Sequence, residues 1–354
     1  MYRILAINPG ATSTKIAVYE DEKEVFSKTI YHSTEELAKF DKISDQYEFR
    51  KKTIIEALKE AGFSFKDFSA IVGRGGLLKP LPGGTYLVNE KMIKDLIERP
   101  RAEHASNLGA IIARDIALSI GVSAYIVDPV CVDEFEPIAR ISGLPEIERE
   151  SLSHALNLKA MAKRYAKEVG RKYEELNLVV VHLGSGISVS AHRNGRMIDV
   201  NDASSEGPFA PERSGSVPER ALVKLCYSGK YTEKEMEKKI FGKGGMYAYL
   251  GTRDAREVEK KIKEGDDYAK LIYEAMAYQV SKEIGAASTV LKGKIDAIII
   301  GGALAYSEMF IPWIKERVSF ISKIILYPGS DEMKALALGV LRVLKGEEEP
   351  KIYN

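Results

Sequence analysis

The sequence predicts an α/β protein made of two halves that begin in the same way. Its 354 residues allow two domains, at roughly 100–200 residues per domain. The apolar run at 5–10 (LAINPG) matches 179–184 (VVVHLG), and each run leads through a loop containing Ser or Thr into a second strand rich in Val or Ile. Strand and helix patterns alternate after each opening. A repeat this long indicates two similar domains rather than a solenoid.

The first half opens with strand-type patterns separated by short turns, which is typical of an antiparallel start. Apolar residues then recur at helical spacing, with short apolar runs between the helices. A helix that ends before Gly170 uses this glycine as its C-cap. We expect strands at 2–8, 15–19, 24–30, 69–72 and 124–128, and helices within 34–61 and at 90–98, 104–120 and 154–169.

The second half repeats the opening and then alternates between helices and strands. The pair Asn194–Gly195 predicts a tight hairpin. The charged tail after residue 345 is expected to fray. We expect two strands around a glycine-rich loop within 178–192, strands at 197–200, 295–300 and 323–327, and helices at 218–228, 232–239, 253–263, 267–291, 304–319 and 332–345.

Composition excludes several classes of function. Lys plus Arg is 52 and Asp plus Glu is 51, which argues against a general nucleic-acid binder, because such proteins neutralise phosphates with an excess of basic residues. The 45% hydrophobic content excludes a disordered chain. Two cysteines cannot form a disulfide framework or a cysteine-based metal site. No apolar run approaches the roughly 20 residues of a membrane span, so we expect a cytoplasmic protein without membrane contact. Two glutamines among abundant Lys and Glu are typical of proteins from heat-loving organisms.

Three glycine-rich segments follow apolar strands and could hold phosphate. They are 8–15 (NPGATSTK), 182–186 (HLGSG) and Gly301–Gly302. Glycines after a strand free backbone N–H groups for an anion, and hydroxyls add donors. None fits the Walker A spacing or the dinucleotide fingerprint. Each loop alone is more often a plain β-turn, but three in one chain, two of them at duplicated positions, predict a nucleotide phosphate site between the domains.

These motifs resemble the superfamily of acetate kinases, sugar kinases, actins and chaperone ATPases, and within it the acetokinase family. Segment 8–15 resembles that family's N-terminal signature, 182–186 resembles its phosphate loop with Ser185 in place of Asn, and 212–215 (ERSG) resembles the motif of its second substrate arginine. The match runs from residue 1 to about 345 and is closest to the members that act on butanoate. The nucleotide-binding residues that the resemblance implies are Asn8, Gly10, Lys15, His182, Gly184, Ser185, Gly186, Arg253, Asp254, Gly301 and Gly302.

The resemblance implies two duplicated ribonuclease H-like domains with a nucleotide cleft between them. It assigns the acyl substrate to residues 1–165, with helix 332–345 packing back on them, and the nucleotide to residues 166–331. The implied reaction is reversible phosphoryl transfer between ATP and butanoate, or a similar short or branched fatty acid, giving ADP and the acyl phosphate. The implied partners are therefore a short-chain carboxylic acid and its acyl phosphate, and the chain is expected to form a homodimer or larger homo-oligomer.

A carboxylate is already a nucleophile, so this reaction needs positive donors more than a strong base. Arg74 and Arg213 offer the planar fork that matches carboxylate and phosphoryl oxygens. The resemblance adds His154 and Asp128 as catalytic residues beside the phosphoryl group. Mg²⁺ is expected to bind mostly through ATP phosphates and water, and the family pattern gives Asn8 and Glu332 as its protein neighbours, with Asp331 competing for the second place.

Two departures from the acetate kinase pattern bear on the substrate. Gly76 and Ser153 stand where acetate kinases carry larger apolar residues, so both are predicted to enlarge the acyl pocket. A neighbouring leucine could instead refill the space at Gly76. An acetate or propionate kinase remains the alternative within the class, and a chaperone-like or filament-forming ATPase the alternative outside it. A sugar kinase, with Asp128 as its base, is also left open.

Overall fold

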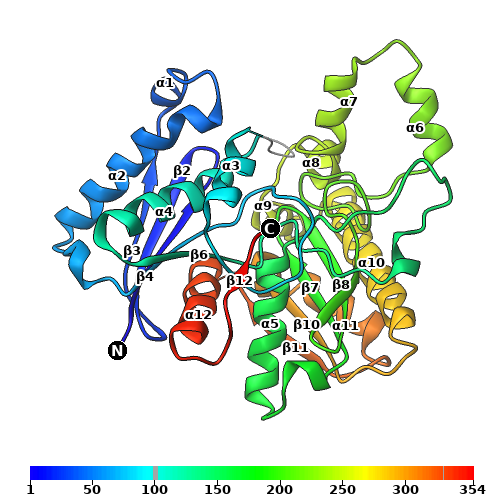
Figure 1. Cartoon of the computed structure of the whole chain (residues 1–354). Coiled ribbons are helices and arrows are strands. Elements are labelled where there is room, and N and C mark those ends of the chain that lie inside the picture. The colour runs from blue at the N-terminus through cyan, green and yellow to red at the C-terminus, as the bar shows by residue number, and fades with distance from the viewer. Residues whose placement is uncertain (99–102, 330) are drawn as a thin grey trace. The chain divides into compact units, whose positions relative to one another are not determined.

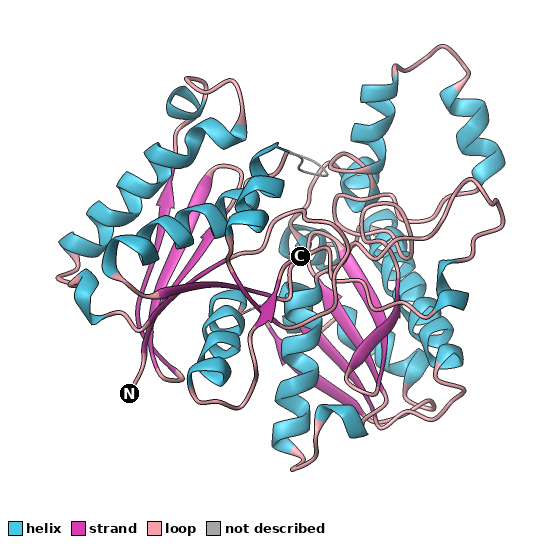
Figure 2. Cartoon of the chain, in the orientation of Figure 1, coloured by secondary structure: helices cyan, strands magenta, loops and turns pink. Residues whose placement is uncertain are grey.

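The computed structural model describes residues 1–98, 103–329 and 331–354. The chain divides into two compact units, one of Met1–Val132 with Asp331–Asn354 and the other of Asp133–Ser330. Each unit has its own sheet and its own helices (Figures 1 and 2). The first unit therefore begins and ends the chain, and the second lies within it.

The first unit is built on a seven-stranded mixed sheet in the order β12-β5-β6-β4-β1-β2-β3. The first three strands form an antiparallel meander, and β4 and β6 add parallel to β1. The strands are β1 (Arg3–Pro9), β2 (Ser13–Glu20), β3 (Lys23–Tyr31), β4 (Ala70–Gly73), β5 (Thr85–Leu87), β6 (Ser123–Val127) and β12 (Lys351–Ile352).

Helices cover both faces of this sheet. Residues 4–7 of β1 alternate in direction and are all 0% exposed, so each face of the strand is covered. Helices α4 and α12 both pack on β1, β4 and β6. The helices of this unit are α1 (Thr34–Leu37), α2 (Tyr47–Glu60), α3 (Glu90–Glu98), α4 (Asn107–Ile120) and α12 (Glu332–Leu344).

The second unit is built on a five-stranded sheet in the order β11-β10-β7-β8-β9. Strands β7, β8 and β9 are antiparallel neighbours, and β10 and β11 continue parallel to β7. The strands are β7 (Leu178–Leu183), β8 (Ile187–Arg193), β9 (Arg196–Val200), β10 (Ala297–Gly302) and β11 (Ile324–Pro328). This repeats the order of β3-β2-β1-β4-β6 strand for strand, which confirms the predicted duplication and the ribonuclease H-like α/β class.

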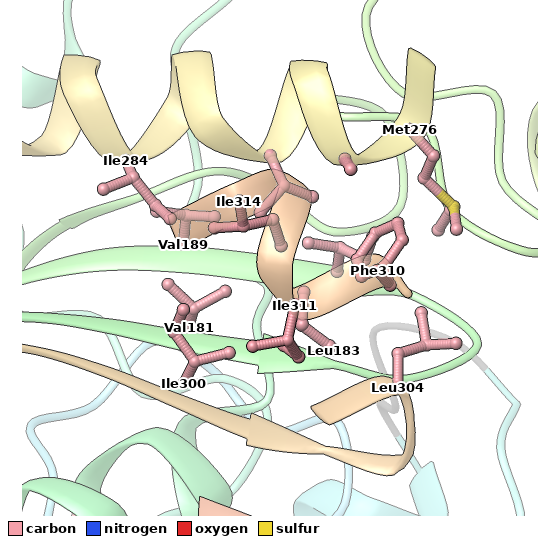
Figure 3. Packing of buried hydrophobic residues seen from close by; sticks show 14 of the residues in the cluster. Val181, Leu183, Val189, Met276, Ile284, Ile300, Leu304, Phe310, Ile311 and Ile314 are labelled. Carbon is pink, nitrogen blue, oxygen red and sulfur yellow. The ribbon is translucent and has the colours of Figure 1, made fainter. Parts of the chain in front are cut away.

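The core of the second unit lies between its sheet and the long helix α10 (Asp267–Val290), with α11 (Phe310–Val318) beside it. Figure 3 shows Val181 and Ile300 of the sheet facing Ile314 of α11. Helix α5 (Ala155–Glu168) also packs on β7 and β10. The remaining helices are α6 (Glu219–Cys226), α7 (Glu233–Ile240), α8 (Gly245–Leu250) and α9 (Ala255–Lys263).

The structure differs from the sequence-based expectations at several places, among them the helix expected at 304–319, where a 3₁₀ turn at Ala303–Tyr306 is separate from α11. The helical region expected at 34–61 is broken after α1. A 3₁₀ turn at Ile43–Gln46 leads into α2, and the Asp45 carboxylate caps this turn by accepting the Lys42 N–H at 3.2 Å. Short elements β5 and α8 were not predicted. The second compact unit starts at Asp133, whereas the boundary was expected at 165, because α5 packs on β7 and β10.

The prediction that the charged tail frays is wrong. Lys351 and Ile352 pair in parallel with Tyr86 and Leu87 of β5. Tyr353 is 2% exposed, and its hydroxyl donates to Asp95 at 3.0 Å. The tail is therefore the edge strand of the first sheet. Among the described helices, none is long and apolar enough to cross a membrane.

Candidate functional site

The loop between β1 and β2 carries the first of the predicted phosphate segments. Asn8 lies near the end of β1, in register with Lys15 on β2. The turn closes through the Gly10 N–H, which donates to the Ser13 carbonyl at 2.7 Å. Residues 11 and 12 are exposed. Beneath the loop lies Arg50 of α2, which is 0% exposed.

Three predicted residues of the first unit meet at the ends of β1 and β4 and the start of α12. The Asn8 amide Nδ2 donates to Glu332 Oε2 at 2.8 Å, and Arg74 Nη1 lies 2.6 Å from the same oxygen. Asp331, the competing candidate, instead caps α12 by accepting the Lys334 N–H at 3.0 Å. The carboxylate beside Asn8 and Arg74 is thus that of Glu332.

Arg74 is held in place by its backbone. Its N–H donates to the Ile7 carbonyl at 2.8 Å, continuing the β1–β4 ladder. The residue is 8% exposed. Burial lowers the pKa of the His104 imidazole, and the Arg74 charge lowers it further. The guanidinium is therefore paired with the carboxylate of Glu332 and lies close enough to His104 to affect its pKa.

Asp128 and Gly76 are placed differently from this cluster. Asp128 is 2% exposed, and its Oδ1 accepts the Gly84 N–H at 2.7 Å. Its backbone has φ of +37° and its N–H donates to the Gly84 carbonyl at 3.0 Å. A β-carbon on Gly76 would overlap Oδ1 of Asn107 and lie 3.0 Å from Leu96 Cδ2. The expected open volume is thus absent on the β-carbon side of Gly76, where Asn107 and Leu96, not Leu77 or Leu78, fill the space.

In the second unit, two predicted histidines lie together. His154 precedes α5 and His182 ends β7, and their ring centroids are 4.4 Å apart at an interplanar angle of 30°. Ser188 of β8 accepts the His154 N–H at 3.4 Å, and its Oγ lies 2.9 Å from His154 Nδ1. The Ser188 hydroxyl therefore holds the Nδ1 side of the His154 imidazole.

The loop between β7 and β8 lies against Arg213. Within the loop, the Gly184 N–H donates to the Gly186 carbonyl at 3.1 Å. A β-carbon on Gly186 would overlap Nη1 and Cζ of Arg213. Ser185 stands at the turn between the two glycines. Only glycine at 186 lets the guanidinium approach the loop so closely.

Arg213 has few partners for a half-buried guanidinium. Its Nη1 donates to the Ala203 carbonyl at 2.8 Å, and its Cζ lies 4.4 Å from the ring centroid of Phe241. Its Nε is buried and makes no hydrogen bond within the described residues. Burial lowers the pKa of Arg213, while the charges of Glu212 and Asp202 act in the opposite direction. Such a group gains from an added anion, because the anion would satisfy its remaining donors.

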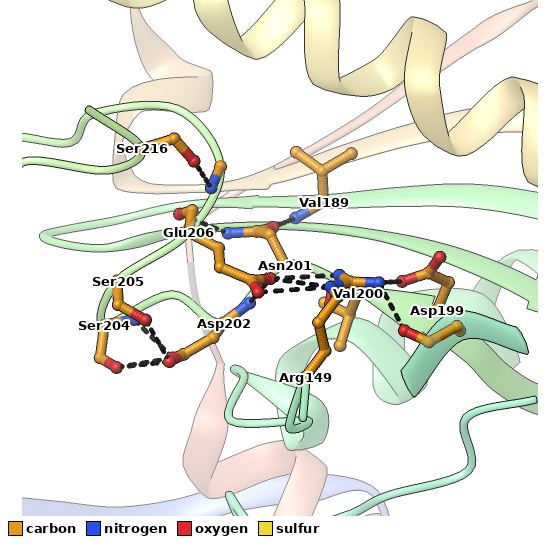
Figure 4. Close-up of polar contacts among 12 residues, drawn as sticks. Arg149, Val189, Asp199, Val200, Asn201, Asp202, Ser204, Ser205, Glu206 and Ser216 are labelled. Atoms are coloured by element: carbon orange, nitrogen blue, oxygen red, sulfur yellow. Dashed lines mark hydrogen bonds and ion pairs between the residues drawn. The ribbon is translucent and has the colours of Figure 1, made fainter. Parts of the chain in front are cut away.

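A polar network fixes the chain around Ala203, whose carbonyl accepts the hydrogen bond from Arg213. Figure 4 shows Arg149, Asp199, Asn201 and Glu206 of this network. Asn201 Oδ1 accepts the Val189 N–H at 2.7 Å, which ties the loop after β9 to β8. Arg149 bridges Asp199 and Glu206, both at 3.1 Å. The segment at 201–206, which contains Ala203, is thereby fixed to the sheet.

Three further candidates of the second unit are Gly301 and Gly302, at the end of β10 next to β7, and Arg253. Gly301 is in register with His182. Gly302 has φ of +97°, and a β-carbon there would overlap the Leu183 carbonyl. Arg253 Nε lies 3.2 Å from Glu212 Oε2, beside Arg213 in the chain.

Asp254 and Ser153 make structural contacts. Asp254 caps α9 by accepting the Arg256 N–H at 2.9 Å, and also pairs with the Arg256 side chain. Ser153 is 5% exposed, and its Oγ lies 3.9 Å from Met197 Sδ. Its small side chain is thus packed against β9.

Sequence reasoning missed several residues that build these clusters. Ser188 and Ser190 alternate with the apolar residues of β8, a pattern typical of a solvent-facing side of a strand, and only the structure shows that both are buried. Arg50, Asn107 and Asn201 gave no signal, because each is an ordinary polar residue in its own segment. A surface hollow of about 420 Å³, lined by Ile93, Ile97, Arg114 and other residues of the first unit, contains none of the predicted residues.

The side chains beside Arg74 suit a cation that accompanies phosphate. The first unit offers an amide and a carboxylate, Asn8 and Glu332, of the kind that hard cations such as Mg²⁺ accept beside phosphate. Among the described residues, no group of three or more His, Cys, Asp or Glu could hold a metal by itself. The residues therefore fit a Mg²⁺ ion that a nucleotide brings with it.

Comparisons with known proteins agree with this chemistry. A model of the acetokinase family matches residues 149–311. Butyrate kinase 2 of Clostridium acetobutylicum is 58% identical over 354 residues, which are 100% of this chain and 99% of that protein. Butyrate kinase 1 of the same organism is 57% identical over 355 residues, covering 100% of both chains. The crystal structure of Porphyromonas gingivalis acetate kinase has a TM-score of 0.80 at 17% identity, covers 97% of this chain and 100% of its own, and shows the same fold. On the strength of the full-length relatives, the chain belongs to the acetokinase family.

Proposed function

We propose that this chain transfers the γ-phosphoryl group of ATP to butanoate, or to a similar short or branched fatty acid, and catalyses the reverse reaction. The full-length likeness to two proteins named butyrate kinase supports this substrate class. The structural observation that carries the proposal is the guanidinium of Arg213 against the glycine loop at Gly186. Within the described residues, no carboxylate forms an ion pair with this arginine.

The reaction forms one bond and breaks one. A carboxylate oxygen of the acid bonds to the γ-phosphorus, and the bond from that phosphorus to the β–γ bridging oxygen breaks, leaving ADP. No proton has to be removed from the acid, which is ionised at neutral pH. The barrier comes from bringing two anions together and from charge on the transferring phosphoryl group.

In the second unit, Arg213 and His154 meet this requirement. Arg213 has donors without partners beside the loop, so it can hold phosphoryl oxygens as charge develops. His154, whose Nδ1 lies 2.9 Å from Ser188 Oγ, is assigned to donate a hydrogen bond to the phosphoryl group. His182 packs against the His154 ring and limits its rotation.

In the first unit, we assign Arg74 to the carboxylate of the substrate or to the phosphoryl group. Its present partner, Glu332, would turn to Mg²⁺ together with Asn8 when the nucleotide binds. The metal supplies neutralisation of phosphate charge when bound. Asp128 completes the proposed catalytic set by holding the chain at Gly84.

The glycine loops are assigned to the nucleotide. Gly10 and Lys15 of the first unit, and Gly184, Ser185, Gly186, Gly301 and Gly302 of the second, would place N–H groups, hydroxyls and one ammonium around phosphates. Arg253 and Asp254 are assigned to the nucleoside side. Ser153 remains the assigned acyl neighbour, whereas the space beside Gly76 is filled by Asn107 and Leu96. We also propose that the chain works in the cytoplasm as a homo-oligomer.

An acyl hydroxamate assay tests the function. The full chain, ATP and Mg²⁺ would be supplied with acetate, propionate, butanoate, isobutanoate and longer acids, and acyl phosphate would be trapped with hydroxylamine. We expect acyl phosphate with short acids and the highest kcat/KM near four carbons. ATP turnover that ignores every acid but rises with a sugar or an unfolded peptide would overturn the proposal.

A further inference from the structure

We propose that Arg50 is a positioning residue that holds the β1–β2 loop in its phosphate-binding form. The inference rests on the proposed function, because it assumes that this loop binds nucleotide phosphate. Arg50 lies in α2, outside the segments that the sequence motifs cover, and its guanidinium is completely buried.

The guanidinium reaches the loop through three backbone carbonyls. Nη1 donates to Gly10 O at 2.8 Å and to Ser13 O at 3.0 Å. Nη2 donates to Ala11 O at 3.0 Å. The planar fork of arginine is suited to such a set of acceptors, since its five N–H groups diverge in fixed directions.

These bonds account for the direction of the loop carbonyls. The fourth carbonyl, that of Thr12, accepts the His32 N–H at 2.9 Å. All four carbonyls from Gly10 to Ser13 are therefore engaged within the protein. The Gly10 N–H closes the turn on the Ser13 carbonyl, so the groups left to consider for an anion are the N–H groups of the exposed residues 11 and 12 and the hydroxyls of Thr12 and Ser13.

The charge of Arg50 is not neutralised by a carboxylate. Its other partners are Gln46 Oε1, at 2.8 and 3.0 Å, and Thr14 Oγ1, at 3.1 Å. Within the described residues every hydrogen-bond acceptor of this guanidinium is thus neutral, and no ion pair involves it. A full positive charge lies directly under a loop that is to receive an anion, where low polarity strengthens its field.

A second layer fixes the first. His32 Nε2 lies 2.9 Å from Thr14 Oγ1, and its ring stacks edge-on against Phe49 at 5.2 Å between centroids. Burial and the Arg50 charge both lower the pKa of His32, so this neighbour adds no competing cation near neutral pH.

The test compares Arg50→Met and Arg50→Lys with Arg3→Met. Arg3 is on the same strand β1 as the loop but at its opposite end, where it bonds Glu20 and Asp67. For each folded variant, ADP affinity would be measured by calorimetry, and kcat, KM for ATP and KM for butanoate by steady-state assay. Melting temperatures would show that each assay is run on folded protein.

We expect Arg50→Met to weaken ADP binding and lower kcat/KM for ATP by about 10- to 100-fold, with KM for butanoate changed less than threefold. Arg50→Lys keeps the charge but loses the fork, so its loss is expected to be intermediate. Arg3→Met should keep ADP affinity. A purely structural role would lower the melting temperature of Arg50→Met and leave ADP affinity and kcat within about twofold of the wild type, which would overturn the proposal.

Two provisions keep the test decisive. If Arg50→Met does not fold, Arg50→Lys alone decides, because unchanged ADP affinity in that variant contradicts the need for the fork. If the wild type lacks activity with every acid, the proposed function fails, yet the calorimetric comparison of ADP affinity still answers whether Arg50 positions the loop.

Discussion

The guanidinium of Arg213 packs directly against the α-carbon of Gly186, so that a β-carbon at position 186 would overlap its Nη1 and Cζ atoms. The contact joins the loop after β7 to a residue 27 positions further along the chain. It depends on the Ala203 carbonyl, which receives Nη1 at 2.8 Å. The loop and the arginine therefore form one surface within the second unit, which we propose binds an anion, and its parts can be tested one at a time.

Gly186→Ala should displace the guanidinium without removing it. We expect kcat to fall by about 10²-fold, because a shift of about 1 Å in a group that contacts the transition state has effects of this size. Steady-state kinetics on folded protein would measure it. Gly285→Ala is the matched control, since a β-carbon on this α10 residue meets nothing within 4 Å. Equal activity of the two variants would contradict the proposed role of the contact.

Arg213→Lys keeps a positive charge and loses the planar fork. We expect kcat to fall by about 10²- to 10³-fold with a modest change in KM for ATP, since the fork acts mainly on charge that develops in the transition state. Arg317→Lys, at a half-buried pair with Glu274 at 3.2 Å, should remain as active as the wild type. A near-normal kcat in Arg213→Lys would show that the fork is dispensable.

Ser188→Ala should release the His154 imidazole. Without its hydrogen bond to Nδ1 the ring can turn away from the orientation in which Ser188 holds it, so kcat should fall by about 10-fold or more. Ser190→Ala is the matched control, because Ser190 is a buried serine of the same strand that bonds His192 instead. The idea fails if both serine variants change kcat equally.

Acyl selectivity should depend on Ser153. Two methylenes separate butanoate from acetate, so full burial at about 0.8 kcal/mol each favours butanoate by roughly 1.6 kcal/mol, or about 15-fold in kcat/KM. Ser153→Phe should lower kcat/KM for butanoate more than for acetate. Ser153→Ala, which adds no volume, should leave the ratio unchanged. A wild type that prefers acetate, or an unaltered ratio in Ser153→Phe, would refute the assignment.

Two buried histidines should make the fold sensitive to acid. Burial lowers the pKa values of His32 and His192 from the ordinary 6.5, that of His192 further. They stay neutral in the fold but gain a proton in the unfolded chain below about pH 6.5, so they have no effect on stability above that pH and reduce it as the pH falls further. Each contributes at most about 1.4 kcal/mol per pH unit.

Urea unfolding from pH 8 to pH 5 would measure this dependence. The midpoint should be flat above pH 7 and fall below pH 6.5. His192→Gln retains a polar side chain between Tyr173 and Ser190 and should make the acid slope shallower. A slope identical to that of the wild type would assign the acid sensitivity to other groups.

Local sequence patterns were enough to predict the two matching openings. The runs at 5–10 and 179–184 became β1 and β7, each followed by an antiparallel partner. These features are readable because strand alternation and turn glycines act between residues that are near in sequence. The same locality made the phosphate-type loops visible before any fold was known.

Long-range packing set what the sequence left open or got wrong. Asp331 and Glu332 are adjacent carboxylates. Glu332 is the one that contacts Asn8 and Arg74, because the ends of β1 and β4 lie beside the start of α12. The tail around Tyr353 looked like a frayed end, yet it pairs with β5, more than 260 residues earlier.

The sequence by itself determined the α/β class, the duplication and the motifs that mark an acetokinase, because these depend on residue types at short fixed spacings. The tertiary structure decided which groups those motifs meet. Asn107 fills the space beside Gly76, and Arg50 supports the loop at Gly10 from another helix. Neither contact could be read from the chain, because burial and partner choice arise only when segments remote in sequence pack together.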